Sequence, residues 1–286
     1  MEILLHRQAK PPRRGAYLLP SLFTVANIFC GFFAITESLQ GASLLSQNLG
    51  AAAAMHFDAA AKAIGFAVLF DGMDGRLARL MGTTSAFGRE FDSLADVTTF
   101  GIAPSVLAFT WGVQAVLPQP GNSTLAHLTG AGWLVSFLFV ISSAARLARF
   151  NIQTTPSASP RADHKSFVGL PTPAGAGLVA AIVHVNDGIP VGEWVWVPFW
   201  LVVLLGTSLL MISTWRYHSF KDLDLKRKRK FAVVIGVAGI VALIWFYSEV
   251  VLLLIAGGYV LSGIVGKLSH LLRRPRMEPH PEEHKV

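Results

Sequence analysis

The sequence predicts an all-α polytopic membrane protein with about eight transmembrane helices. Of its 286 residues, 52% are hydrophobic and only 14% are charged, whereas soluble proteins carry about 25% charged residues. Apolar segments of about 20 residues, the length that spans the hydrocarbon core of a bilayer, recur along the chain. The Lys and Arg residues gather in alternate connections between these segments, as they do in membrane proteins of defined orientation.

Eight segments are long and apolar enough to be predicted as transmembrane helices. They cover residues 17–37, 59–81, 88–115, 128–150, 168–186, 193–214, 231–247 and 249–270. The second segment is the least clean, because Asp71, Asp74 and two further charged residues interrupt it. The last two segments are separated only by the letters YSEV, which favours a tight hairpin over one long bent helix.

The distribution of basic residues predicts which side each connection faces. The connections around 39–57, 116–127, 187–192 and 248 contain no Lys or Arg, although the chain has 24 of them. Cytosolic loops carry the basic excess, so both termini are expected in the cytosol and the protein in the cytoplasmic (inner) membrane. The net charge of +7 is then explained by topology and by contact with anionic membrane lipids, and no nucleic acid partner is expected.

These assignments divide the chain into five predicted parts. They are a cytosolic N-terminal segment (1–16), a membrane core (17–214), a basic cytosolic loop (215–230), a C-terminal transmembrane hairpin (231–270) and a cytosolic tail (271–286).

Four aspartates lie where hydrocarbon is expected. Asp71 and Asp74 are three residues apart, and Asp92 and Asp96 are four apart, so each pair shares one face of its helix. If the two helices pack as an antiparallel hairpin around residues 82–88, Asp71 faces Asp96 and Asp74 faces Asp92. We therefore expect the four carboxylates to form one cluster that opens toward the cytosol.

Such a cluster predicts bound metal. One unpaired charge at the membrane centre costs about 2.5–3.5 kcal/mol, and four carboxylates also repel one another. Two divalent cations would neutralise them, and hard oxygen ligands suit Mg²⁺ or Mn²⁺. The small residues Gly75, Ala78 and Gly88 lie on the same helix faces and leave room for a ligand, although small residues also serve helix packing. Arg79, at the cytosolic end, suits a phosphate oxygen.

These residues compose a longer motif. It reads D-x-x-D-G-x-x-A-R, eight residues, then G-x-x-x-D-x-x-x-D, and it resembles the signature of the CDP-alcohol phosphatidyltransferase family at every position. The segments LPSLFTVANIFCGFFAI, ARLARFN and FVGLPTPAGAG extend the likeness, most closely to the serine-using members, over most of residues 17–230. The resemblance implies transfer of the phosphatidyl group of CDP-diacylglycerol to the hydroxyl of L-serine, with CMP as the second product, by a membrane-embedded homodimer.

The resemblance also implies roles for single residues. Asp71, Asp74 and Asp92 would ligate two divalent cations, and Asp96 would both ligate metal and act as the general base. The CDP moiety would be bordered by Gly75, Ala78, Arg79, Gly88 and Asn27, although Asn27 would equally suit a hydrogen bond between helices.

Two arginines near the predicted cytosolic end of a helix are further candidates. Arg146 and Arg149 would bind the serine carboxylate or a lipid phosphate, with plain membrane anchoring as an equal alternative. Glu37 and Asp58, near the opposite ends of the helices, receive no role.

Two alternative functions stay open. Another enzyme of the family would use glycerol 3-phosphate, inositol phosphate or choline as the acceptor, and a phosphorylated acceptor would need more basic residues beside the carboxylates. A divalent-cation transporter would use the carboxylates as an ion path. The transporter is less favoured, because the helices beyond Asp71 and Asp96 are mostly apolar.

Overall fold

The computed structural model describes residues 18–81, 86–116, 123–154, 166–218 and 230–272. These residues are almost entirely helical, and the predicted all-α class is confirmed. The helices are α1 (Leu18–Ser46), α2 (Gly50–Met81), α3 (Ala86–Asp96), the π-helix η2 (Val97–Ile102), α4 (Ala103–Gly112), α5 (Ser123–Thr154), α6 (Thr172–Val185), α7 (Trp196–Ile212) and α8 (Lys230–Leu272). The strands β1 (Ser166–Val168) and β2 (Arg216–His218) pair in an antiparallel ribbon.

Five stretches of helix are long and apolar enough to cross a membrane. They are Ser21–Ser46, Gly50–Met73, Phe87–Gly112, Ser123–Ile152 and Ala242–Ser269, and α6 and α7 are shorter apolar helices. Large apolar side chains such as Phe29 on α1, Trp133 on α5 and Phe199 on α7 are more than half exposed. A water-soluble surface would not expose so much apolar area, so these faces contact lipid in a membrane protein. The count of eight spans stays a prediction.

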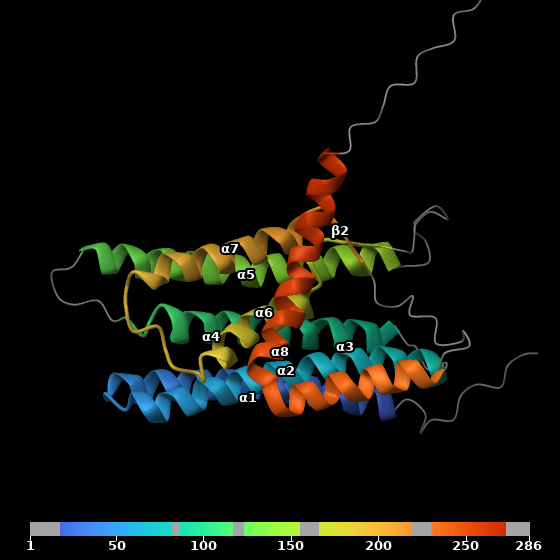
Figure 1. The fold of residues 1–286 in the computed structure, drawn as a ribbon, viewed down its shortest axis with the longest axis horizontal. Helices are drawn as coiled ribbons and strands as arrows, with labels where there is room; N and C mark the ends of the chain where they lie inside the picture. The colour runs from blue at the N-terminus through green and yellow to red at the C-terminus, as the bar shows by residue number, and fades with distance from the viewer. Residues whose placement is uncertain (1–17, 82–85, 117–122, 155–165, 219–229, 273–286) are drawn as a thin grey trace, which may run out of the picture.

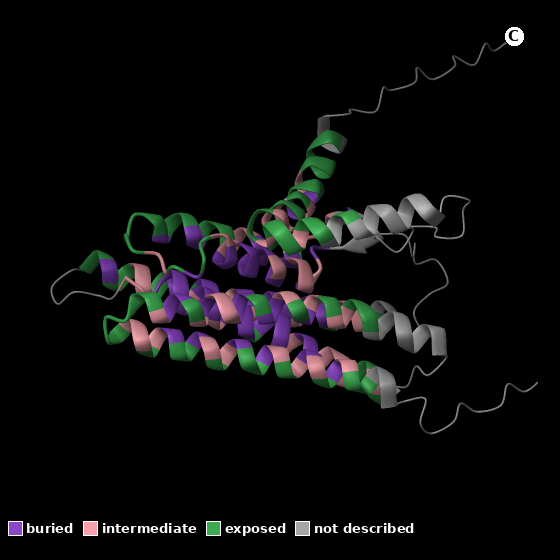
Figure 2. Ribbon diagram, turned by 60° about the horizontal axis from the view of Figure 1, so that its bottom comes forward, coloured by how far each residue is buried: buried purple, intermediate pink, exposed green. Residues whose placement is uncertain are grey.

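The helices lie in three layers, which Figure 1 shows from the side. The antiparallel pair of α1 and α2 forms one outer layer, α5 and α7 form the other, and α3, α4 and α6 lie between them. Figure 2 shows the buried residues on the faces that the layers turn toward one another. The ends of α2, α5 and α7 and the start of α3 lie at the same end of the molecule.

Backbone and side-chain hydrogen bonds join the layers where packing is tight. Ser105 Oγ on α4 donates to the carbonyl oxygen of Ser136 on α5 at 2.7 Å. Trp200 Nε1 on α7 donates to the carbonyl oxygen of Ala108 on α4 at 2.9 Å, and the indole lies where a side chain at Gly112 would otherwise project. Glycine is therefore required at position 112 for this approach.

A second group of polar contacts lies away from the acidic cluster. His56 Nδ1 lies 2.6 Å from Glu37 Oε2 and joins α2 to α1. His184 on α6 contacts Asp58 on α2 and Ser248 on α8. Glu37 and Asp58, which received no role from the sequence, are thus contacts between helices.

Three features differ from the predicted spans. The span 88–115 corresponds to one continuous helical stretch, Phe87–Gly112, but its middle part, η2, is π-helical and lies between α3 and α4. The spans 231–247 and 249–270 correspond to the two helical parts of α8, which meet at a kink at Tyr247, where the backbone is not helical (φ −139°, ψ 45°). Figure 1 shows the two parts of α8 running in different directions from this kink, and the predicted transmembrane hairpin over 231–270 stays a prediction.

The third difference is the β-ribbon. Ser166, at the end of a predicted polar loop, pairs with His218, and Phe167 pairs with Tyr217. Gly169 follows the ribbon with a positive φ of 84°, and its N–H donates to the carbonyl oxygen of Trp215. The ribbon ties the start of α6 to the end of α7. The predicted segment 1–16, most of the predicted tail 271–286 and most of the basic loop lie outside the described residues.

Candidate active site

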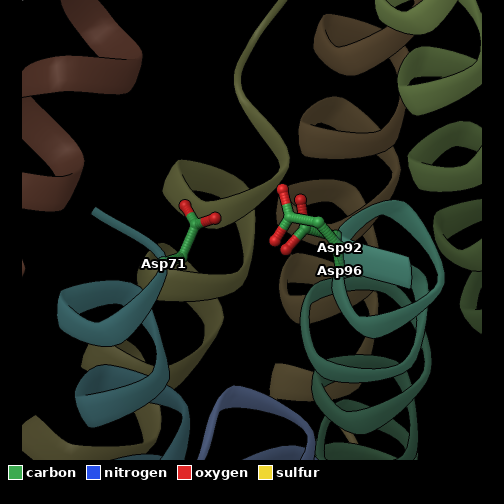
Figure 3. Close-up of side chains that lie close together, drawn as sticks. All are labelled: Asp71, Asp92 and Asp96. Carbon is green, nitrogen blue, oxygen red and sulfur yellow. The ribbon is translucent and has the colours of Figure 1, made fainter. Parts of the chain in front are cut away.

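Three carboxylates meet between α2 and α3. Asp71, Asp92 and Asp96 each offer an oxygen atom, and these three atoms lie within 4.8 Å of one another. Figure 3 shows the Asp92 and Asp96 carboxylates side by side on α3, turned toward Asp71 on α2. The expected approach of Asp71 and Asp96 is therefore present, and Asp92 lies at the same place. The side chain of Asp74 is outside the described part of the structure.

Local helix geometry explains why Asp92 and Asp96 share one direction. Residues four apart in an α-helix lie on one face, and α3 continues through both residues until it ends at Asp96. The π-helix begins at the next residue, Val97, and three of its residues, Thr99, Phe100 and Gly101, are buried. Short π segments occur frequently at functional sites. This π-helix packs against α1 directly after the last residue of α3.

The cluster is buried where it meets α1. Asp96 is 8% exposed and Asn27 is fully buried. Asn27 Nδ2 donates to Asp96 Oδ1 at 3.3 Å, and Thr99 Oγ1 donates to the carbonyl oxygen of Asn27 at 3.0 Å. Asn27 thus reaches the site by contacting Asp96, and this contact is one that the spacing of residues did not predict.

The surroundings of the carboxylates fit a bound cation. Asp92 Oδ1 is buried and has no hydrogen-bond partner among the described residues. Three carboxylates at this distance repel one another strongly in a region of low dielectric, and burial of an unpaired charge is costly. Carboxylate oxygens are the ligands that Mg²⁺ and Mn²⁺ prefer. The donor set is therefore that of a hard divalent metal.

The two candidate arginines have different surroundings on α5. Arg146 is 6% exposed and lies within electrostatic range of the Asp96 carboxylate and of the Tyr259 side chain. Its Nη2 donates to the carbonyl oxygen of Gly169 at 3.4 Å. Arg149 instead donates to the carbonyl oxygens of Ile212 and Ser213, at 3.0 and 3.4 Å, where α7 ends. The structure therefore brings only Arg146 close to the carboxylates.

The residues expected around CDP are placed only in part. Asp74, Gly75, Ala78 and Arg79 lie in the last turns of α2, and their side chains are outside the described part of the structure. Gly88 lies in the first turn of α3, one turn before Asp92. Their role in CDP binding stays a prediction.

Sequence reasoning missed two residues near the site. Asn151 Nδ2 on α5 donates to Ser93 Oγ on α3 at 2.8 Å, beside Asp92 in the sequence. Tyr259, on the second part of α8, lies near Arg146. Asn151 belongs to the segment ARLARFN, and the family likeness of this segment could have indicated that Asn151 lies near the site. Tyr259 had none, because no periodicity relates α8 to α5.

The fold and the site together define a class of protein. The sequence model of the CDP-alcohol phosphatidyltransferases matches residues 17–195, a range that contains all the aspartates of the motif. The chain therefore belongs to the CDP-alcohol phosphatidyltransferase family.

Particular relatives in this family carry one name. A CDP-diacylglycerol–serine O-phosphatidyltransferase of Helicobacter pylori (strain ATCC 700392 / 26695) is 36% identical over 255 residues, which cover 89% of this chain and 92% of the relative. Proteins of the same name from Mycobacterium leprae and Methanocaldococcus jannaschii are each 33% identical. Their matches cover 68% and 54% of this chain, and 56% and 61% of the relatives.

Proposed function

We propose that this protein transfers the phosphatidyl group of CDP-diacylglycerol to the hydroxyl of L-serine and releases CMP. The observation that carries the proposal is the cluster of Asp71, Asp92 and Asp96 within apolar helices of a chain of this family. The names of relatives that match nearly the whole chain support serine as the acceptor.

In the proposed reaction, the serine hydroxyl oxygen forms a bond to the lipid-side phosphorus of the diphosphate. The bond from that phosphorus to the bridging oxygen breaks, and CMP leaves with the electron pair. Asp96 accepts the hydroxyl proton, a task for which a carboxylate within hydrogen-bond reach is suited. The burial of Asp96 and its contact with Asn27 support this choice, because a base must be held in one orientation.

Two divalent cations, Mg²⁺ or Mn²⁺, are the proposed cofactors. Asp71, Asp74, Asp92 and Asp96 would hold them, and when bound they would neutralise the charge that develops on the leaving CMP. Gly75, Ala78, Arg79 and Gly88 are proposed to border the CDP moiety, as the family motif implies.

The surroundings of the arginines support a small unphosphorylated acceptor. A phosphorylated alcohol would need several cations beside Asp96, as phosphate recognition usually does. Of the two candidate arginines, Arg149 donates to the end of α7, whereas Arg146 is within electrostatic range of Asp96. One buried guanidinium matches the single carboxylate of serine.

The buried face of α2 argues against a transport path. Asp71 and Asp58 are separated by 13 residues, which span roughly 20 Å of helix, and the side chains of α2 that are fully buried between them are Ala60, Ile64 and Ala67. These side chains offer no ligand to an ion. The site is thus closed on the side that faces Asp58, as expected of an enzyme that receives both substrates from the other side.

We further propose that the protein lies in the cytoplasmic membrane as a homodimer, with the site facing the cytosol. The end of α2, the start of α3 and the end of α5 lie at one end of the molecule, and Arg89 and Arg149 belong to these parts of α3 and α5. This arrangement supports the orientation, because basic residues mark the cytosolic side. Chemical cross-linking in native membranes tests the dimer.

The deciding experiment supplies the purified protein with CDP-diacylglycerol and Mn²⁺ or Mg²⁺. L-Serine, glycerol 3-phosphate, inositol phosphate and choline are then offered separately, and CMP release is measured. We expect release that depends on serine and on metal. Release with another acceptor alone would refute serine, and dye-detected Mn²⁺ entry into vesicles without CMP release would indicate a transporter.

The proposed base is tested by Asp96→Asn. Loss of a general base typically costs 10²–10⁴-fold, so we expect kcat to fall by at least about 10³-fold, because Asp96 would also hold metal. Binding of CDP-diacylglycerol, measured by isothermal calorimetry, should be largely retained. Asp187→Asn, at an exposed turn, is the matched control and should keep full activity. Near-normal turnover of Asp96→Asn would show that Asp96 is not the base.

A further inference from the structure

Asn27 is a buried amide on the face of α1 that packs against the rest of the protein. It is fully buried, and its Nδ2 donates to Asp96 Oδ1. An ionised carboxylate only accepts hydrogen bonds, so the amide nitrogen must be the atom that faces Asp96. The amide oxygen, Asn27 Oδ1, has no partner among the described residues. Leaving a buried acceptor unpaired is costly, and an apolar side chain would pack there without this cost.

Asn27 is also held through its backbone. Thr99 Oγ1, in the π-helix, donates to the carbonyl oxygen of Asn27. Gly31, one turn further along α1, allows this approach, because a Cβ atom there would lie 2.5 Å from Thr99 Oγ1 and 2.9 Å from Thr99 Cα. The segment from Asp96 to Thr99 is therefore joined to both the side chain and the main chain of one residue of α1.

The position of Asp96 at the end of α3 explains how the hydrogen bond from Asn27 could matter for the site. Asp96 is the last residue of α3, and the π-helix starts at Val97. The regular α-helical pattern that fixes Asp92 is thus interrupted directly after Asp96. A hydrogen bond from outside the helix then limits the rotation of the Asp96 carboxylate, as second-sphere partners of metal-binding carboxylates do.

We propose that Asn27 is a positioning residue that orients the Asp96 carboxylate, and that Thr99 and Gly31 hold Asn27 in place. The proposal rests on the proposed function, in which Asp96 ligates metal and accepts the serine proton. It assigns Asn27 a task that differs from the direct contact with CDP that the family resemblance implied. The two tasks predict different kinetics.

Asn27→Leu separates them, because leucine has a similar volume and lacks the donor. If Asn27 positions Asp96, kcat falls by about 10–100-fold, while KM for CDP-diacylglycerol changes by less than about threefold. The Mn²⁺ affinity of the substrate-free protein, measured by electron paramagnetic resonance, should fall by about tenfold. A raised KM for CDP-diacylglycerol with unchanged kcat and unchanged Mn²⁺ affinity would overturn the proposal, as would no effect at all.

Thr99 provides a second test that leaves Asn27 intact. Thr99→Val removes the hydroxyl but keeps the shape, and we expect kcat and Mn²⁺ affinity to fall by about 3–10-fold. Thr99→Ser keeps the hydroxyl and should restore both. Ser105→Ala is the matched control, because it deletes another buried hydroxyl that donates to a backbone carbonyl of a neighbouring helix. If Thr99→Val and Ser105→Ala lowered kcat and Mn²⁺ affinity equally, the effect would come from the loss of helix packing in general, and the proposal would be overturned.

The two hypotheses fail in distinguishable ways. Absence of serine-dependent CMP release by the unmodified protein would refute the proposed function. The Mn²⁺ measurement uses metal alone and needs no acceptor, so it tests the Asn27–Asp96 contact in either case.

Discussion

Arg146 and Arg149 lie one helical turn apart on α5, but their surroundings differ. Arg149 donates to the carbonyl oxygens of Ile212 and Ser213, which the end of α7 would otherwise leave without partners. Arg146 is buried, and its Nε has no hydrogen-bond partner among the described residues. Because a buried guanidinium with an unused donor is costly, we expect Arg146 to meet an anionic group of a substrate.

This difference predicts opposite effects of the same substitution. Arg146→Gln should raise KM for serine by at least about tenfold, since truncating one member of a buried charge pair costs about 2–5 kcal/mol. Arg149→Gln should leave KM for serine unchanged and lower the midpoint of thermal unfolding. Steady-state kinetics and a thermal denaturation assay measure both variants. Equal increases in KM would show that the two arginines act together at the site.

At the scale of elements, His184 connects three helices. On α6, its Nδ1 lies 2.5 Å from Asp58 Oδ1 of α2, and its Nε2 lies 2.9 Å from Ser248 Oγ of α8. Asp58 also pairs with Lys62 one turn along α2, at 2.6 Å. Ser248 follows the bend at Tyr247, so the contact fixes α8 where its helix is interrupted.

We expect His184→Leu to destabilise the fold without altering the chemistry. Hydrogen bonds between membrane helices contribute about 0.6–1.7 kcal/mol each, so the loss of two should cost about 1–3 kcal/mol. His127→Leu, at an exposed position of α5, is the matched control. Thermal unfolding in detergent measures stability, and KM for both substrates should stay near wild type. A stable His184→Leu variant with reduced kcat would contradict this assignment.

At the scale of the whole molecule, α8 lies beyond the part of the chain that the family model matches. The family model matches residues 17–195, whereas α8 starts at Lys230. The buried ring of Tyr217 in β2 occupies the space beside Gly263 of α8, and its hydroxyl donates to the carbonyl oxygen of Val260 at 3.5 Å. Tyr259 of the same helix is within electrostatic range of Arg146, so the docking of α8 relates the β-ribbon to the arginine that we propose as a ligand of serine.

Gly263→Ala tests this docking. A Cβ atom at position 263 would lie 2.7 Å from Tyr217 Oη and closer still to the ring carbons. Overpacking of this kind costs about 1–3 kcal/mol, so the unfolding midpoint should fall and KM for serine should rise. Gly266→Ala, where no atom lies within 4 Å, should match the wild type. If both variants behave alike, α8 does not depend on this contact.

The positions of most helices could be predicted because apolar length and helix rise are local properties. The predicted spans 59–81 and 128–150 lie inside α2 and α5, and the span 17–37 coincides with α1 from residue 18 onward. The π-helical part of the third span could not be predicted, because a short segment with i→i+5 hydrogen bonds leaves no periodic signal in the sequence. Thr99 belongs to this π-helical part, and its hydroxyl donates to the carbonyl oxygen of Asn27 on α1.

The sequence by itself determined that this is a helical membrane protein of a family with paired aspartates. It also determined that Asp71 and Asp96 would meet, because helical spacing and an antiparallel connection act over short stretches of chain. Only the tertiary structure decided that Asn27 contacts Asp96, that Arg149 caps α7 and that His184 joins α2 to α6. These partners are 69, 63 and 126 residues apart. Such contacts depend on how whole helices pack, and no local pattern in the chain encodes them.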